Sequence, residues 1–181
     1  AVEKGESDAA SLPPNVHSMN SYTRGEVEEG FAEADVVLER NYRTGIVHQG
    51  YMEPQVCVAS PDPMGIMTIY TSTQGPRTVH KDVSRLLDLP HTKVKVVPMM
   101  IGGGFGGKCE FTNQPITAFL AQATGKPVKM TLSREDDMSM MKSRHGGKIY
   151  MKTGASKDGT LLARDCRIIL DGGAYADESP E

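Results

Sequence analysis

The stretch VVPMMIGGGFGGKCE, Val96 to Glu110, joins an apolar run to a lysine through five glycines and one phenylalanine. Glycine loses more conformational freedom on folding than any other residue, so a run of this kind is costly to order. It is expected where the backbone must adopt positive φ angles or where another group approaches the main chain closely. The stretch therefore predicts a close approach, either by another part of the chain or by a ligand.

The sequence around this glycine loop predicts a β-α-β-α-β segment. Runs rich in β-branched and apolar residues predict three strands, at Gly65–Thr73, His91–Pro98 and Lys126–Ser133. Two stretches between them predict helices, Gly75–Leu89 and Phe111–Gly125. The first helix places its apolar residues on one face and has a proline suited to the first turn, while the second ends at a glycine.

A helical crossover generally makes the two strands that it joins parallel. The loops at the carboxyl ends of parallel neighbours lie on the same edge of a sheet. Thr73–Gly75 and Gly102–Gly107 should therefore face one crevice, where open α/β sheets bind ligands. Since adjacent strands are ~5 Å apart, we expect the Cα atoms of Gln74 and Phe105 to lie within roughly 15 Å of each other.

The rest of the chain predicts a mixed architecture. An acidic helix is expected near Glu26–Ala34, followed by a strand near Val36–Tyr42 and another over Pro54–Ser60. Residues Gly146–Tyr175 resemble two long antiparallel strands around an Asp158-Gly159 turn. Parallel and antiparallel parts together predict an α+β fold with a mixed sheet. Residues 1–20 are polar and aperiodic and are interpreted as an interdomain linker, with residues 21–181 as part of one domain.

Composition excludes several classes of function. The net charge is −3 over 181 residues, so neither nucleic acid nor an anionic membrane is favoured electrostatically. No apolar run reaches the roughly 18–20 residues that span a bilayer, so no transmembrane segment is expected. Cys57, Cys109 and Cys166 are scattered, which argues against a disulfide framework or a zinc site. We interpret them as reduced thiols of a cytoplasmic protein.

The loop also has to be compared with a nucleotide-binding P-loop, G-x-x-x-x-G-K-[ST]. Gly102–Lys108 satisfies the first seven positions, and Asp171 ends an apolar run as a magnesium-binding aspartate would. The eighth position fails, because Cys109 replaces the hydroxyl and a thiol is a poor ligand for Mg²⁺. Pro115 also lies too far beyond the lysine for the helix to begin as it should. A nucleotide hydrolase is therefore the weakest of the alternatives.

Two interpretations of the loop remain open from the residues alone. In one, the glycines permit a close crossing of two backbone segments without a ligand. In the other, successive N–H groups converge on one acceptor and form an anion-binding nest. Phe105 would then pack its ring as a wedge while its N–H joins the nest. The second arrangement suits a bulky anionic cofactor.

The ordered set of motifs resembles the molybdenum-binding large subunit of the xanthine dehydrogenase, aldehyde oxidoreductase and carbon-monoxide dehydrogenase family, the molybdenum hydroxylases. The resemblance extends from about Asn15 to Ala176 and centres on Ser72–Lys108. The stretches that carry it are STQGPRTVHKDVSRLLDLPHTKVKVVPMMIGGGFGGK, RGEVEEGFAEADVVLERNYR, HQGYMEPQVCVASPDP, TGKPVKMTLSRED, RHGGK, DGTLLARD and LDGGAYAD.

This resemblance implies a cofactor and a reaction class. Members hold molybdenum through molybdopterin, in bacteria usually as molybdopterin cytosine dinucleotide. They oxidise an aldehyde, an N-heterocycle or a similar small molecule with oxygen from water. Electrons then pass to [2Fe-2S] clusters and FAD on partner subunits or domains. The chain would be part of such an oxidoreductase, the N-terminal half of its molybdopterin-binding domain.

The resemblance also implies site residues. Gln74 matches the glutamine whose amide hydrogen-bonds the apical oxygen of molybdenum, and Gly103, Gly104, Phe105 and Gly106 match the loop whose N–H groups approach the cofactor. Cys109 stands where some members have a substrate-binding glutamate, and the acid follows one residue later. No such role is transferred to Glu110, and none is assigned to His48, Glu53 or Lys108.

The family's general-base glutamate is expected beyond residue 181, so the chain is interpreted as a fragment that is inactive alone. Its partners would be the remainder of its own large subunit and the iron–sulfur and flavin subunits. A non-catalytic half-domain that binds a pterin or another subunit is the alternative.

Overall fold

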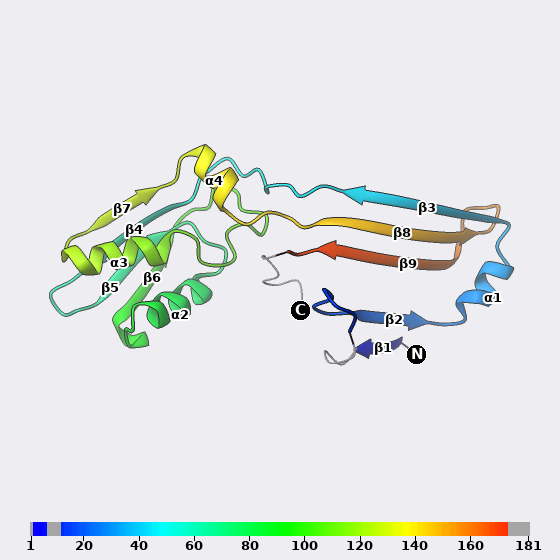
Figure 1. Cartoon of the computed structure of the whole chain (residues 1–181), viewed down its shortest axis with the longest axis horizontal. Coiled ribbons are helices and arrows are strands. Elements are labelled where there is room, and N and C mark those ends of the chain that lie inside the picture. Colours follow the sequence, from blue (N-terminus) through cyan, green and yellow to red (C-terminus); the bar gives the residue numbers. More distant parts are fainter. Residues whose placement is uncertain (1, 7–11, 174–181) are drawn as a thin grey trace. The chain divides into compact units, whose positions relative to one another are not determined.

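A computed structural model describes residues 2–6 and 12–173 of the chain. The chain forms two compact units, one made of residues up to Ile46 together with those from His145 onward, the other of Val47–Arg144. Helices, a mixed sheet and antiparallel sheets are all present, which confirms the α+β class (Figure 1).

The first unit is built mainly from long antiparallel strands. Strands β3 (Val36–Thr44), β8 (Gly146–Ala155) and β9 (Leu161–Asp171) form a three-stranded sheet in the order β3-β8-β9. The chain turns between β8 and β9 at Gly159, which has a φ of +91° and donates its N–H to the Ser156 carbonyl. This confirms the hairpin expected around the Asp158-Gly159 turn.

The amino-terminal part of the same unit contains a smaller pairing. Strand β1 (Val2–Glu6) pairs antiparallel with β2 (Asn20–Arg24), and helix α1 (Val27–Ala32) follows, within the expected helical stretch. Part of the stretch expected as a linker is thus hydrogen-bonded into a sheet. The division into a linker and a domain stays a prediction.

The second unit contains a four-stranded mixed sheet in the order β6-β5-β4-β7. Its strands are β4 (Val56–Pro61), β5 (Met67–Thr71), β6 (Val94–Pro98) and β7 (Val128–Thr131). Strands β5 and β6 are parallel, as the crossover predicts, whereas β4 is antiparallel to both β5 and β7. The third strand of the β-α-β-α-β segment therefore lies beside β4, at the opposite edge from β6.

The two helices that the sequence predicts in the second unit are present but shorter than expected, and a third helix, α4 (Arg134–Met140), was not predicted. Helix α2 (Pro76–Leu86) has a proline in its first turn, and α3 (Gln114–Thr124) ends at Gly125, which has a φ of +63°. A short 3₁₀ turn, η2 (His91–Lys93), precedes β6. Helix α4 is capped by the Ser133 side chain, which accepts the Asp136 N–H.

The core of this unit lies between the sheet and helices α2 and α3, which also contact each other. Alternate residues of β4 and β5 point into it, as the alternating burial of these strands requires. Its buried members are Cys57, Ala59, Met67, Ile69, Val79, Val83, Val94, Ala118 and Ala121. No described helix is long and apolar enough to cross a membrane.

Candidate functional site

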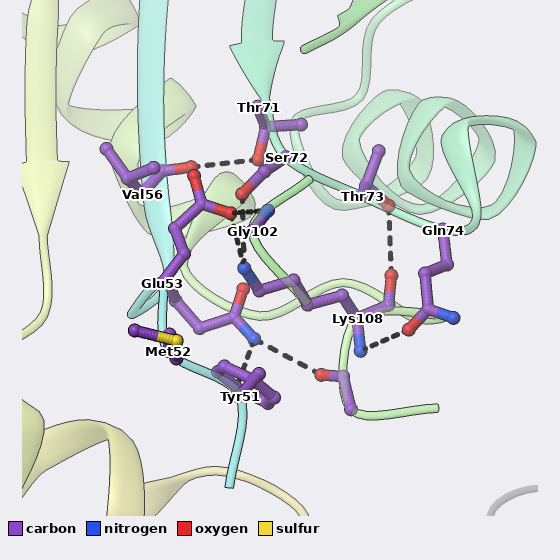
Figure 2. Close-up of polar contacts among 12 residues, drawn as sticks. Tyr51, Met52, Glu53, Val56, Thr71, Ser72, Thr73, Gln74, Gly102 and Lys108 are labelled. Carbon is purple, nitrogen blue, oxygen red and sulfur yellow. Dashed lines mark hydrogen bonds and ion pairs between the residues drawn. The ribbon is translucent and has the colours of Figure 1, made fainter. Parts of the chain in front are cut away.

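Gln74 and the glycine loop meet at the carboxyl ends of β5 and β6. The Gln74 N–H donates to the Lys108 carbonyl at 2.8 Å, and its carboxamide oxygen accepts the Gly106 N–H at 3.1 Å. The same oxygen accepts the Lys108 N–H at 3.3 Å (Figure 2). These bonds limit the separation of the Gln74 and Phe105 Cα atoms to about 11 Å. The expected meeting of the two loops is therefore confirmed.

The same hydrogen bonds orient the Gln74 carboxamide. Because Oε1 accepts two backbone N–H groups, the Nε2 group must point away from them, as Figure 2 shows. The side chain is exposed, and Nε2 has no acceptor among the residues that the structure describes. Gln74 thus presents a fixed hydrogen-bond donor to whatever lies beside the loop.

Most of the glycines are required by packing within the chain. A Cβ at Gly102 would lie 2.6 Å from Cβ of Glu53, and one at Gly107 would lie 2.7 Å from Cε1 of Tyr51. At Gly104 it would lie 2.8 Å from Cδ of Gln74. The close-crossing interpretation therefore explains these three positions without a ligand.

The backbone at the tip of the loop supports the nest as well. Gly103, Phe105 and Gly106 have φ angles of +93°, +52° and +93°. Among described residues, the N–H groups of Gly103, Gly104 and Phe105 have no acceptor, while those of Gly102, Gly106, Gly107 and Lys108 all do. Three consecutive unpaired donors at a positive-φ turn can together bind an electron-rich ligand.

Phe105 departs from the expectation for its side chain. A non-glycine residue with positive φ is uncommon and marks local strain that the surroundings must maintain. The Arg144 guanidinium donates to the Phe105 carbonyl at 2.9 Å, which helps to hold this peptide. Phe105 is 62% exposed, so its ring is not packed as a wedge against the residues that the structure describes.

Lys108 is not a solvated cation. Its side chain is 1% exposed, and Nζ lies 2.8 Å from Oε2 of Glu53 and 4.8 Å from the centre of the Tyr51 ring. The same Glu53 oxygen accepts the Gly102 N–H at 2.8 Å. Burial raises the pKa of Glu53, but the bonds and charge supplied by Lys108 and Gly102 outweigh burial and lower the pKa overall.

Tyr51 packs against the buried side of the loop, next to Gly103 and Gly107. It is 1% exposed and donates its hydroxyl to Asp137 Oδ1 at 3.0 Å, while Gln55 Nε2 donates to the hydroxyl oxygen at 2.9 Å. Gln55 also donates to the Gly107 carbonyl at 3.2 Å. Burial is the main reason why the pKa of Tyr51 rises to about 12, with Asp137 adding to it. A neutral, hydrogen-bonded phenol therefore supports the loop.

The remaining polar residues near the loop have structural partners, with one exception. His48 Nε2 lies 3.2 Å from the Tyr51 hydroxyl, and its Nδ1 accepts the Gly50 N–H. Glu110 forms an ion pair with Lys142. The exception is Gln49, whose buried Oε1 has no donor among the described residues. An atom of this kind indicates that a donor from outside, water or ligand, completes the site.

The geometry rejects the P-loop alternative. A P-loop lysine must extend to the phosphates of the nucleotide. Lys108 instead turns into the protein and bonds Glu53, so it cannot reach a ligand above the loop. Helix α3 begins only at Gln114, too far along the chain to point its first N–H groups at such a ligand.

Comparison with known proteins identifies the family. The profile of the molybdopterin cofactor-binding domain matches residues 9–181. The chain is 37% identical over 166 residues to the nicotinate dehydrogenase large molybdopterin subunit of Eubacterium barkeri, covering 92% of this chain and 39% of that protein. It is 36% identical to a probable xanthine dehydrogenase subunit of Bacillus subtilis (strain 168), covering 99% of this chain and 25% of that one.

Solved structures agree with this result. The aldehyde oxidoreductase of Desulfovibrio gigas superposes with a TM-score of 0.76 at 27% identity, covering 86% of this chain and 17% of that one. The chain belongs to the molybdopterin cofactor-binding domain family, as the motifs predict. It spans only 39% and 25% of the lengths of the two relatives named above.

The residues present fit such a cofactor. The unpaired N–H groups of Gly103–Phe105 and the Nε2 group of Gln74 supply donors for an electron-rich ligand. Within the described residues no cluster of three or more His, Cys, Asp or Glu could bind a metal ion directly.

Proposed function

We propose that Gln74 and the loop Gly103–Gly106 bind molybdopterin with its molybdenum, and that the chain is the cofactor-binding portion of a molybdenum hydroxylase. The observation that supports this most strongly is the set of donors without acceptors, the N–H groups of Gly103–Phe105 and Nε2 of Gln74, at one sheet edge. Family membership supplies the chemical identity of the ligand.

Each group would have a distinct task. The N–H groups of Gly103, Gly104 and Phe105 would donate to electron-rich atoms of the cofactor, and Gly106 would leave room beside them, since a Cβ there would meet nothing within 4 Å. Gln74 Nε2 would donate at the molybdenum end of the cofactor, as the resemblance implies. Its direction is fixed in advance by the two bonds to its oxygen, so little reorganisation is required on binding.

The bound cofactor would supply oxidation of a carbon centre with oxygen from water. Relatives are named for nicotinate, xanthine and aldehydes, so we propose an aldehyde or an N-heterocycle as the substrate class. We propose the cytosine dinucleotide form of the cofactor, and [2Fe-2S] and FAD partners as electron acceptors, in the cytoplasm. No general base is assigned to residues 1–181, so this chain alone should show no turnover.

The test is the cofactor content of the full-length protein that carries this chain. Molybdenum should be present at about one atom per polypeptide, together with a fluorescent oxidised pterin and, after hydrolysis, CMP. Absence of both metal and pterin from protein made in a host that synthesises the cofactor would contradict the proposal. Cofactor without turnover on aldehydes or N-heterocycles would instead support the non-catalytic alternative.

A further inference from the structure

A single carboxylate oxygen joins the two ends of the glycine loop. Oε2 of Glu53 accepts the N–H of Gly102, where the loop begins, and the ammonium of Lys108, where it ends, each at 2.8 Å (Figure 2). The Glu53 N–H also donates to the Gly102 carbonyl at 3.1 Å. The loop is therefore closed at its base by a residue about fifty positions earlier in the sequence.

Burial makes this contact unusual. Lys108 is 1% exposed, and its ammonium is compensated by Glu53, by the Ser72 hydroxyl at 3.4 Å and by the face of Tyr51. Buried ion pairs are weak sources of stability, because desolvation opposes the attraction between the charges. Replacing a buried ion pair by well-packed apolar residues is often neutral or stabilising, so a gain in stability is a weak explanation for charges at this position.

Lys108 also connects the ion pair to Gln74. Its main chain makes two hydrogen bonds to that residue: its N–H donates to Gln74 Oε1 and its carbonyl accepts the Gln74 N–H. The side chain and main chain of one residue thus link Glu53 to the carboxamide that faces the cofactor. If the side chain of Lys108 is released, the two main-chain hydrogen bonds between Lys108 and Gln74 should weaken, and the orientation of Gln74 then depends on the Gly106 N–H alone.

We infer that Glu53 and Lys108 are positioning residues that hold the glycine loop in its binding shape before the cofactor arrives. They do not touch the ligand; they act through the loop and through Gln74. The inference rests on the proposed function, because the loop is taken to be the cofactor-binding element. The inference gives a role to Glu53 in the stretch HQGYMEP, to which the sequence alone assigns none.

Three variants of the full-length protein test the inference. Glu53→Gln retains an acceptor for the Gly102 N–H but removes the charge, and Lys108→Met removes the ammonium while keeping a chain of similar length. The double variant leaves no uncompensated buried charge. Glu110→Gln is the matched control, because it breaks the ion pair with Lys142 directly after the loop without joining the loop's ends.

Two quantities are measured on each protein. The first is hydrogen–deuterium exchange of the peptide that contains residues 102–108, in cofactor-free protein. The second is the amount of molybdenum and pterin per polypeptide after expression in a host that synthesises the cofactor. We expect exchange to rise and loading to fall about tenfold or more in all three variants, as with other residues that orient ligand-binding groups. The control should match wild type. Thermal stability should recover in the double variant while loading stays low.

Recovery of loading in parallel with stability in the double variant would overturn the inference, since it would show a purely structural role. Unchanged exchange in Glu53→Gln and Lys108→Met would overturn it as well. The failure of the proposed function looks different: wild-type protein would then carry no molybdenum or pterin, while the exchange measurement would still decide whether the ion pair holds the loop.

Discussion

The carboxamide oxygen of Gln74 lies 3.1 Å from the amide nitrogen of Gly106 and accepts a hydrogen bond from it, although the two residues are 32 positions apart in the sequence. This bond joins the segments that follow two parallel strands, β5 and β6, and leaves the carboxamide nitrogen directed away from the N–H groups that its oxygen accepts. Backbone geometry, rather than a neighbouring side chain, therefore sets the direction in which Gln74 can donate.

The two halves of the Gln74 carboxamide can be separated by substitution. Gln74→Glu keeps an oxygen for the Gly106 and Lys108 N–H groups but removes the donor, whereas Gln74→Ala removes both. We expect Gln74→Glu to retain the melting temperature of wild type and to lose about 10–100-fold in cofactor loading or turnover. Gln74→Ala should lose stability too, by about 1–3 kcal/mol, because two amides lose their acceptor. Equal cofactor loading in Gln74→Glu and wild type would show that the Nε2 donor of Gln74 is not needed for cofactor binding.

Adding a methyl group at Gly104 should displace Gln74. A Cβ there would lie 2.8 Å from Cδ of Gln74 in a buried position, so Gly104→Ala should cost about 1–3 kcal/mol in unfolding free energy and abolish loading. Gly65→Ala is the control for lost stability: Gly65 has a φ of +76° and open space, so alanine there should cost about 1–2 kcal/mol through backbone strain without changing loading. Thermal unfolding of both variants measures the loss of stability, and molybdenum analysis shows whether only Gly104→Ala loses the cofactor.

The Glu53–Lys108 pair should make stability depend on pH in acid. The pKa of Glu53 is lowered in the folded protein, so its stabilising contribution is complete above the unfolded value of about 4.3 and is lost as pH falls through the folded pKa. At neutral pH, Glu53→Gln should cost about 3 kcal/mol, because it leaves a buried ammonium without its partner. The difference in unfolding free energy between wild type and variant should shrink as pH falls through the lowered pKa of Glu53, as followed by denaturant unfolding. A difference that is constant with pH would contradict this.

Cys57 and Cys166 should differ in reactivity. Cys57 is completely buried in the core, and burial raises the pKa of its thiol to about 11, whereas Cys166 is exposed. Since the thiolate is the reactive form, iodoacetamide at pH 8 should label Cys166 quickly and Cys57 only after unfolding. Peptide mass spectrometry measures both rates in one sample. Rapid labelling of Cys57 in the native protein would show that the core of the second unit is wrongly described.

The sequence predicted the elements around the loop well because their signals are local. The alternation of GIMTIYTST and the one-sided apolar pattern of α2 depend on neighbouring residues. The lateral order of strands depends instead on which faces pack together, and nothing local indicates that β7 pairs with β4 rather than extending the sheet beyond β6. The parallel pairing of β5 and β6 could be predicted because a single helix joins them.

The parts of the site that belong to a sequence motif could be predicted, whereas the parts that depend on contacts between residues far apart in the sequence could not. The meeting of Gln74 with the glycine loop followed from strand direction. The burial of Lys108 did not, because its partner Glu53 lies 55 residues away and a lysine after glycines usually faces solvent. The exposure of Phe105 could not be predicted either, because its φ of +52° is set by the loop as a whole.

The amides of Gly103, Gly104 and Phe105 test the central claim most directly. They have no acceptor among the described residues, so they should exchange with deuterium rapidly in cofactor-free protein. If they form the cradle for molybdopterin, their exchange in the loaded full-length protein should slow by about tenfold or more, a modest protection for bonds at an accessible loop. Identical exchange of these three amides with and without bound cofactor would contradict the account.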